Sequence, residues 1–225
     1  MDPARRDSEK NKKFLLEDLS PNLLEIQEKL LEISEEVMIK LSPLIDISYL
    51  ISVLKKVRKI QIIAVKNEVR ELVVFLNSAQ NNTDVEISCV NLESEEPEFT
   101  FNYEEEKCAV AEFSDALQFL YIPNNSVLKS GGFKMVSGAF NLKKLHPNSH
   151  FYASNELVKN FPGRILKVEI MDSKEIKKGE KFNIISKNYP LSPDEIKKKY
   201  KIKDGGEHYL IFTQTQKSKI ILKSC

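Results

Sequence analysis

The chain of 225 residues lacks the features that mark membrane, secreted and zinc-binding proteins. Its longest apolar runs, such as residues 60–65, end well short of the roughly 20 residues that a membrane-spanning helix requires. The charged residues 1–7 precede no apolar signal segment. Cys89, Cys108 and Cys225 form neither a Cys-x-x-Cys pair nor a zinc spacing. We therefore expect a cytoplasmic protein with reduced thiols and no membrane contact.

Glycine is scarce, with 7 residues, and the glycine motifs of nucleotide-binding and hydrolytic enzymes are missing. The sequence contains no Gly-x-Gly-x-x-Gly, no Gly-x-x-x-x-Gly-Lys-Ser/Thr and no Gly-x-Ser-x-Gly. These absences exclude a self-contained phosphate-binding loop and a nucleophile elbow.

The histidines do not indicate a metal site. His146 and His150 are four residues apart, but Pro147 between them disfavours the helix that would let both bind one ion. We therefore predict no metal. Residues 146–152 are interpreted instead as a loop whose donors and aromatic rings contact a nucleic acid, with a purely structural loop as an equal alternative.

The charges that are present divide unevenly along the chain. Residues 1–110 contain 14 Lys and Arg against 22 Asp and Glu, a net charge of −8, whereas residues 111–225 contain 20 against 11, a net charge of +9. A basic half is a candidate for binding a polyanion, and a solvated lysine-rich surface is the alternative.

The hydrophobic pattern predicts an α/β region followed by an α+β region. Ser20-Pro21 marks a helix start, and residues 59–65 are apolar enough for a parallel strand buried on both faces. In the first half we expect helices at 21–33 and 47–54, strands at 37–39, 59–65 and 99–101, and an antiparallel hairpin of 71–76 with 84–90.

The second half is expected to mix strands and short helices after a boundary near residue 108. Gly131-Gly132 indicates a helix break, and Ser192 to Glu195 is a capping box that starts a lysine-rich helix over 196–200. Strands are expected at 119–122, 164–170 and 182–185, with 209–212 pairing with 220–222.

Several sequence blocks together resemble a known family. They are Asp2-Pro3-Ala4-Arg5-Arg6-Asp7, residues 16–21, 39–48 and 65–68, then 121–129, 142–150, 161–164 and 203–206. Over essentially the whole chain these blocks resemble the second half of a class I S-adenosylmethionine-dependent methyltransferase, in particular a bacterial family with a C-terminal THUMP-like domain.

This resemblance implies a fold. The first region would be a partial Rossmann-like methyltransferase sheet whose last strands include an antiparallel hairpin, and a ferredoxin-like and THUMP-like α+β region would follow. The implied domains are residues 1–108, the carboxyl-terminal half of the methyltransferase domain, then 109–161, a small ferredoxin-like region, and 162–225, the THUMP-like domain.

The resemblance also implies a reaction and its residues. Asp2, Pro3, Ala4 and Arg5 would form the catalytic loop, in which Asp2 and the Pro3 carbonyl orient the target atom. Arg5 replaces the aromatic residue that stacks a flipped adenine in relatives, which disfavours adenine N6 as the target. The residues expected to bind substrate are Arg6, Lys40, Ser42, Lys66, Asn67 and Glu68.

The implied partner is RNA, either ribosomal or transfer RNA, and the implied cofactor is S-adenosylmethionine. The glycine-rich cofactor loop would lie before Met1, so we expect this chain alone to bind the cofactor poorly and to associate through its truncated sheet, as a homodimer for example. The alternative is a stand-alone RNA-binding module without catalytic activity. The expected RNA contacts are Lys129, Lys134, Lys143, Lys144, His146, Asn148, His150, Phe151, Tyr152 and Arg164.

Overall fold

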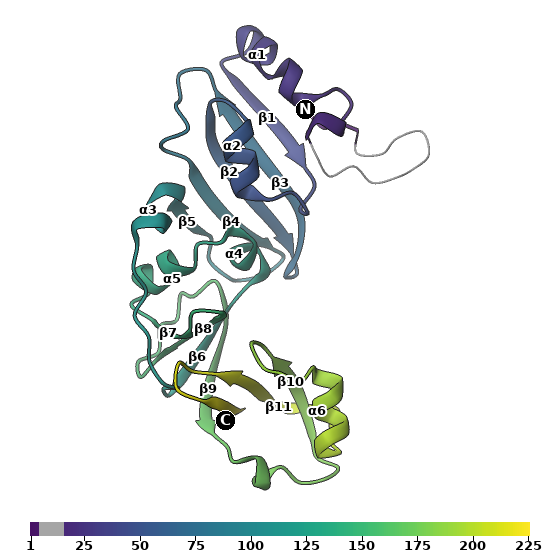
Figure 1. The fold of residues 1–225 in the computed structure, drawn as a ribbon, viewed down its shortest axis with the longest axis vertical. Coiled ribbons are helices and arrows are strands. Elements are labelled where there is room, and N and C mark those ends of the chain that lie inside the picture. The colour runs from purple at the N-terminus through teal and green to yellow at the C-terminus, as the bar shows by residue number, and fades with distance from the viewer. Residues whose placement is uncertain (5–15) are drawn as a thin grey trace. The chain divides into compact units, whose positions relative to one another are not determined.

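The computed structural model describes residues 1–4 and 16–225, shown as the coloured ribbon in Figure 1. Contacts divide the chain into two compact units, which we call unit 1, residues 1–109 with 124–135, and unit 2, residues 110–123 with 136–225. Segment 124–135 therefore packs with the first half of the chain although it belongs to the second half of the sequence. The domain ranges given above stay a prediction.

Unit 1 contains a mixed five-stranded sheet in the order β1-β3-β2-β4-β5. β3 is antiparallel to both β1 and β2, β2 and β4 are parallel, and β5 is antiparallel to β4. The strands are β1 (Glu36–Leu41), β2 (Val57–Val65), β3 (Glu68–Asn77), β4 (Glu86–Leu92) and β5 (Phe99–Asn102).

The antiparallel hairpin is formed by β2 and β3, so its predicted place between residues 71–76 and 84–90 is wrong. Lys66 and Asn67 join the two strands with φ angles of 50° and 65°. Positive φ at both central residues is typical of the tight type I′ turn of two-residue hairpins. The asparagine-rich stretch instead connects β3, on one side of β2, with β4, which pairs in parallel with the other side of β2.

Two helices of unit 1, α2 and α4, lie over one face of this sheet (Figure 1). α4 contacts β2, β3 and β4. Ile60, Ile62 and Ala64 of β2 are fully buried while their neighbours are partly exposed, so the strand is buried on one face and not on both as predicted. The helical elements are η1 (Leu16–Asp18), α1 (Leu23–Ile33), α2 (Ile47–Val53), α3 (Tyr103–Cys108) and α4 (Asn125–Ser130).

Two helix ends of unit 1 test the sequence signals directly. α1 begins after Asn22, whose side chain accepts a hydrogen bond from the amide of Leu24 at 3.0 Å, so Asn22 is the N-cap in place of the predicted Ser20. α4 ends at Gly131 with φ of 77°, which confirms the predicted helix break.

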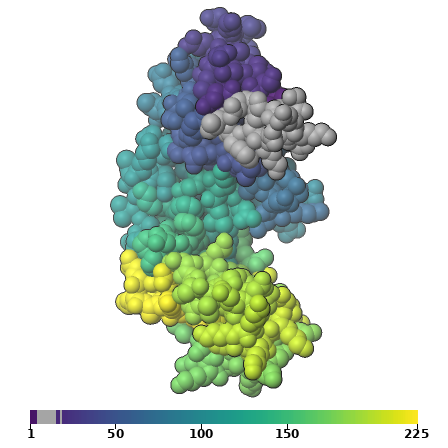
Figure 2. All heavy atoms as spheres, turned by 45° about the vertical axis from the view of Figure 1, so that its right-hand side comes forward, coloured from purple at the N-terminus to yellow at the C-terminus, as the bar shows by residue number. Residues whose placement is uncertain are grey.

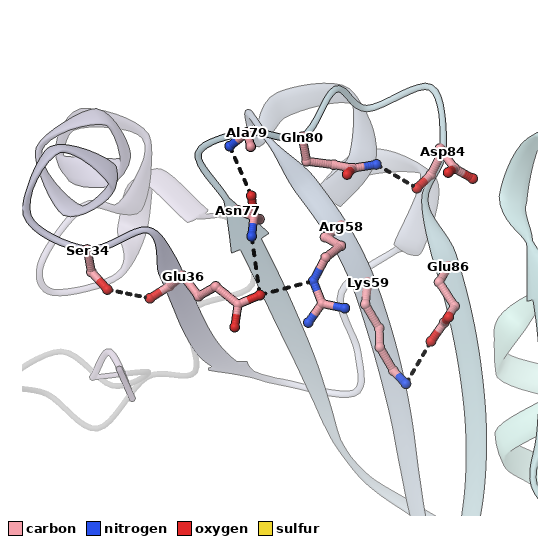
Figure 3. A network of polar contacts seen from close by, with 9 residues as sticks. All are labelled: Ser34, Glu36, Arg58, Lys59, Asn77, Ala79, Gln80, Asp84 and Glu86. Atoms are coloured by element: carbon pink, nitrogen blue, oxygen red, sulfur yellow. Dashed lines mark hydrogen bonds and ion pairs between the residues drawn. The ribbon is translucent and has the colours of Figure 1, made fainter.

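The other face of the sheet is more polar. The register places Lys40, Val73, Gln61, Ser88 and Thr100 side by side in one row across the strands. Toward the opposite ends of the strands, a second set of polar side chains pairs across the sheet (Figure 3). Its contacts are Arg58 Nε to Glu36 Oε1 at 3.4 Å, Asn77 Nδ2 to Glu36 Oε1 at 3.2 Å and Lys59 Nζ to Glu86 Oε1 at 2.7 Å.

Unit 2 is built on a seven-stranded sheet in the order β10-β11-β12-β9-β6-β8-β7, in which β10 and β11 are parallel and the other pairs antiparallel. Ile211 lies opposite Leu222, which confirms the predicted pairing of 209–212 with 220–222. The strands are β6 (Phe119–Pro123), β7 (Lys143–His146), β8 (Ser149–Ser154), β9 (Gly163–Ile170), β10 (Lys181–Ser186), β11 (Lys203–Gln214) and β12 (Lys219–Ser224).

The remaining helices are α5 (Phe133–Ala139), η2 (Ser173–Glu175) and α6 (Pro193–Tyr200). The capping box that starts α6 is present as predicted, because Ser192 and Glu195 each accept a hydrogen bond from the other's backbone. Residues 146–152 form the turn and second strand of the β7–β8 hairpin, so their interpretation as a loop is wrong.

The mixed α+β class expected from the sequence is confirmed by these two mixed sheets. Within residues 1–4 and 16–225, no helix is both long and apolar enough to cross a membrane.

Candidate functional site

The predicted catalytic residue Asp2 lies beside the end of β1. The amino group of Met1 donates a hydrogen bond to the Met38 carbonyl at 2.6 Å, and the Lys40 amide donates one to the Met1 carbonyl at 2.9 Å. This pattern is that of a parallel strand pair, so Met1 is held against β1 as a neighbouring strand residue. The backbone immediately before Asp2 is therefore fixed against β1.

Lys40 joins two acids at this point. Its Nζ lies 2.7 Å from Asp2 Oδ2 and 3.5 Å from Glu71 Oε1. The hydrogen bond to Asp2 raises the pKa of Lys40, with smaller contributions from the negative charges of both acids and an opposing one from desolvation. All three side chains are at least one-third exposed, so the cluster is charged and open to water. The structure thus brings together Asp2, expected in the catalytic loop, and Lys40, expected to bind substrate, and adds Glu71, which the sequence did not indicate.

The rest of the predicted catalytic loop is only partly described. Pro3 is buried, and Ala4 pairs with Ser20, whose carbonyl accepts from the Ala4 amide at 2.9 Å. These contacts anchor the chain immediately after Asp2. Arg5 and Arg6 lie outside the described residues.

Ser42 lies in the turn after β1 and holds that turn. Its hydroxyl accepts a hydrogen bond from the Leu44 amide at 3.3 Å, and its carbonyl accepts from the Ile45 amide at 3.3 Å. These local bonds stabilise the turn that ends β1.

The three residues predicted after β2 bond to partners elsewhere in unit 1. Lys66 pairs with Glu93 at 2.9 Å, and Glu68 pairs with Arg70 at 2.7 Å. Asn67 Oδ1 accepts from the Asn125 amide at 2.6 Å, and the Asn67 carbonyl accepts from Asn125 Nδ2 at 2.6 Å. Asn67 therefore links the β2–β3 turn to the start of α4.

Two lysines predicted to bind RNA belong to unit 1. Lys129 Nζ donates to the Ile45 carbonyl at 2.9 Å, and burial lowers its pKa. Lys134 Nζ donates to the Lys107 carbonyl at 2.9 Å. Lys129 also lines a cavity of about 270 Å³ together with Asp46, Ser48, Tyr103 and Lys107. Both lysines therefore contribute to the packing of unit 1 and not to the basic surface of unit 2.

Three of the predicted RNA contacts in unit 2 are exposed. Lys143 Nζ forms an ion pair with Glu112 at 3.0 Å, and Asn148 occupies the β7–β8 turn. The Arg164 guanidinium lies 4.6 Å from the centre of the Tyr209 ring. These side chains are available to a ligand in solution.

The others are withdrawn from the surface. Phe151 is 2% exposed and Tyr152 is fully buried, so the prediction that their rings stack on a base is wrong. Lys144 is 5% exposed, and its ammonium group donates to the Pro147 carbonyl at 3.1 Å, which removes it from the surface set. Phe151 and Tyr152 are consecutive on β8 and point to opposite faces of the sheet, and both are buried because both faces are covered there.

The histidines of this hairpin have structural partners. His146 Nδ1 contacts Asn188 Nδ2 at 2.9 Å and accepts from the Asn148 amide at 3.0 Å. Burial, with smaller contributions from the positive charges of Lys144 and Lys187, lowers the pKa of His150 from 6.5 to about 4. Among the described residues no group of three His, Cys, Asp or Glu side chains could hold a metal ion.

A groove that the sequence did not reveal lies in unit 2. It has a volume of about 500 Å³ and is lined by aromatic, apolar and lysine side chains, among them Tyr189, Lys199, Tyr200 and Lys219. The lysine-rich helix was recognised from its capping box, but nothing local in the sequence places it beside Tyr189 and Lys219.

Comparison with known proteins places these features in families. Residues 119–162 match a ferredoxin-like domain and residues 164–224 match a THUMP domain-like family. The chain is also similar to the crystal structure of a putative methyltransferase from Porphyromonas gingivalis W83, with 31% identity over 99% of this chain and a TM-score of 0.85. The chain spans 57% of the length of that protein. No curated protein matches the sequence.

The second half of the chain is therefore a ferredoxin-like domain followed by a THUMP-like domain. The two domain matches and the similarity to that structure over 99% of the chain confirm the resemblance expected from the sequence blocks.

The residues present do not by themselves make an S-adenosylmethionine site of the expected kind. All 7 glycines follow residue 130, so none stands at the strand ends of the unit 1 sheet where a glycine-rich turn would hold the cofactor. At Gly132 the space that a Cβ would take is filled by the Phe101 ring, 2.5 Å away, and not by an open cradle.

Proposed function

We propose that the chain is the substrate-binding part of an S-adenosylmethionine-dependent methyltransferase that acts on RNA, either ribosomal or transfer RNA. The observation that carries this proposal is the combination of a THUMP-like domain at residues 164–224 with similarity to a methyltransferase structure over 99% of the chain. S-adenosylmethionine would be held by residues that this chain does not supply.

The unit 1 sheet supports the proposal. Class I methyltransferases end their sheet with an antiparallel last strand, and β3 is antiparallel to both of its neighbours, β1 and β2. β1 and β2 therefore run in the same direction and are connected through α2, as in a βαβ unit. Their carboxyl ends lie at the edge of the sheet where α/β proteins bind ligands.

Asp2 and Lys40 have the chemistry to position a substrate there. The ammonium group of Lys40 holds the Asp2 carboxylate at 2.7 Å, and both groups remain open to water. A carboxylate held in this way accepts a hydrogen bond from an exocyclic amine or ring N–H and orients the atom beside it. We assign this orienting role to Asp2 and the positioning of Asp2 to Lys40.

Unit 2 has positive charge to offer a polyanion. In this unit Lys143, Lys197, Lys217 and Lys223 form ion pairs with described acids. Exposed lysines without an ion pair to another described residue include Lys174, Lys178, Lys187, Lys198, Lys199, Lys201 and Lys219. Unpaired lysines on a folded surface release counterions when they meet phosphates, and this release drives RNA binding.

A second function is favoured by the absence of glycine from residues 1–130. On this alternative the chain is an RNA-binding module that transfers no methyl group. The two functions differ in the role of Asp2, because its carboxylate orients the substrate only if methyl transfer takes place.

The test measures RNA binding and methyl transfer with the full chain. We expect the affinity for transfer RNA or a ribosomal fragment to fall at least about tenfold between about 50 and 200 mM salt. A salt-independent affinity, or no binding, contradicts the RNA assignment. Saturable binding of S-adenosylmethionine by calorimetry at micromolar concentration contradicts the inference that its site lies elsewhere.

Methyl transfer is tested by adding a cofactor-binding segment taken from the similar methyltransferase. Labelled methyl groups should then pass to RNA, and Asp2→Asn should reduce this transfer while leaving RNA affinity unchanged. If the complemented chain binds RNA but Asp2→Asn has no effect on transfer, the role of Asp2 is wrong. If it binds RNA and transfers nothing, the binding-module alternative is favoured.

A further inference from the structure

We propose that the groove lined by Tyr189, Lys199, Tyr200 and Lys219 binds an unpaired nucleotide of the RNA, with the base against the tyrosines and the flanking phosphates on the lysines. This inference rests on the proposed function and gives it a location. The predicted RNA contacts on β7, β8 and β9 are separate from this groove, which none of those residues lines.

Four segments that are distant in the sequence form the groove. Met171 follows β9, Tyr189 follows β10, Lys199 and Tyr200 end α6, and residues 219–221 begin β12. α6 and the turn containing η2 lie at the surface of unit 2, where Figures 1 and 2 show the corresponding green and lime segments. The volume of this open groove is about 500 Å³.

The rings of the two tyrosines pack against the buried ring of Phe212. Phe212 is fully buried, and its ring centre lies 5.3 Å from that of Tyr189 in an edge-on arrangement and 5.7 Å from that of Tyr200 in a tilted one. Both tyrosines are half-buried, and no hydrogen bond joins either hydroxyl to another described residue. Rings supported on one side and open on the other are pre-organised for stacking, which limits the entropy lost on binding.

The lysines give the groove its charge. Lys199 and Lys219 are exposed, and neither forms an ion pair with another described residue. Lys199 Nζ lies 5.4 Å from the centre of the Tyr200 ring, so an ammonium group and an aromatic face are presented together. Asp172 is the only acid of the lining, and its carboxylate accepts a hydrogen bond from the Lys174 amide at 2.8 Å as the cap of η2.

The apolar part of the lining determines the form of the ligand. Met171, Ile220 and Ile221 offer no hydrogen-bond donors, so a phosphate alone would leave much of the groove unfilled. A base has an apolar face for these side chains and for the tyrosines, but only an unpaired base can present that face. The combination therefore favours a single-stranded nucleotide over a duplex or a free phosphate.

The experiment compares two double variants of the full chain that remove the same charge. Lys199→Ala with Lys219→Ala changes the groove, whereas Lys178→Ala with Lys198→Ala removes two exposed lysines that do not line it. Affinity is measured by fluorescence anisotropy at fixed salt, with a labelled single-stranded RNA of about 12 nucleotides and with the corresponding duplex. We expect the groove variant to lose at least about tenfold in affinity for the single strand and the control variant less than about threefold.

The aromatic contribution is tested separately. Tyr200→Leu keeps apolar volume against Phe212 but removes the stacking surface, and Tyr200→Phe keeps that surface and serves as its control. We expect a loss of about fivefold or more in single-strand affinity for the leucine variant and less than twofold for the phenylalanine variant. Circular dichroism melting curves establish that both variants are folded, and Tyr189→Leu with Tyr189→Phe replaces the pair if they are not.

The outcomes separate this inference from the proposed function. Equal losses in the two lysine double variants, or equal affinities for single strand and duplex, overturn the groove while leaving RNA binding by the chain intact. Failure of the unmodified chain to bind RNA overturns the proposed function as well. Binding of adenosine monophosphate as tight as that of the oligonucleotide indicates a free nucleotide as the ligand and overturns the RNA assignment of the groove.

Discussion

The two units of the chain use their charged side chains differently. In unit 1 most described cations form ion pairs with acids of the same unit, namely Lys40, Lys55, Arg58, Lys59, Lys66, Arg70 and Lys107. In unit 2 ion pairs between described residues involve four lysines, and the lysines around α6 and η2 are largely unpaired. Paired charges neutralise one another at close range, whereas unpaired charges of one sign add up to a field that extends about 10 Å into solution.

Net charge alone therefore does not locate a binding surface. The −8 and +9 of the two halves indicate which half attracts an anion, but they do not show which lysines are free. Lys129 and Lys134 come after the charge boundary in the sequence and are nevertheless engaged within unit 1. The groove beside α6 combines unpaired lysines with aromatic rings, and that combination follows only from the fold.

The largest difference in stability between the two units is expected from Phe212→Ala. The ring is fully buried under both groove tyrosines, so its removal leaves a cavity and should cost about 3–5 kcal/mol of folding free energy in unit 2. Amide hydrogen exchange should show lost protection in β10, β11 and β12 and unchanged protection in β2 and β4. Phe113→Ala removes a ring that is 36% exposed and should cost about 1 kcal/mol or less. Equal loss of protection in both sheets would contradict a difference between the units.

A smaller effect is expected in unit 1 from Asn67→Ala. The change removes the acceptor for the Asn125 amide and leaves alanine at a positive φ, so we expect a loss of about 1–2 kcal/mol and faster exchange at the start of α4. Lys66→Ala is the matched control, because Lys66 also has positive φ but makes only an exposed ion pair. Chemical denaturation measures both, and a cost for the control as large as that for Asn67→Ala would argue against the asparagine link.

The smallest expected effect is a difference between the units in the pH range over which acid lowers their stability. The pKa of His150 is lowered from 6.5 to about 4, so the unfolded chain takes up a proton in a range of pH where the folded chain does not. Its contribution to the stability of unit 2 is therefore complete above pH 6.5 and is lost as the pH falls toward 4. In unit 1 the hydrogen bonds of Ser48 and Tyr49 lower the pKa of Asp46 below 3.8, so that contribution is lost only at more acidic pH.

Because His150 is only half-buried, solvent screening keeps the expected change small. Denaturation midpoints of unit 2 at pH 7 and pH 5 measure it, and His150→Gln should reduce the difference between them. An unchanged difference in the variant would show that another group causes the pH dependence.

Two features that depend on nearby residues were predicted correctly, whereas the hairpin and the exposure of Tyr152 were not. The Ser192 and Glu195 capping box and the helix end at Gly131 were predicted correctly, because both depend on residues within one turn. The hairpin was misplaced because Asn77 to Thr83 looks like a turn, while Lys66 and Asn67 carry no glycine to mark theirs. The expected exposure of Tyr152 was also wrong, because the segments that cover both faces of β8 are not adjacent to it in the sequence.

Some residues of the candidate site were also predicted correctly and others were missed. Asp2 and Lys40 were expected in one crevice from the resemblance, and the structure joins them by an ion pair. Glu71 was missed because it meets Lys40 only through the pairing of β1 with β3. The groove residues Tyr189 and Lys219 lie thirty residues apart, and no local pattern connects them.

Local sequence alone was enough for the capping box of α6, the helix end at Gly131, the division of charge and the blocks that resemble methyltransferases with a THUMP-like region. The tertiary structure decided that β3 lies between β1 and β2, which lysines are paired, and that Tyr189 and Tyr200 rest on one buried phenylalanine. Local features depend on backbone conformations and hydrogen bonds within a few residues. Strand order and side-chain pairing depend on which distant segments bury apolar surface together, and that is settled only when the whole chain folds.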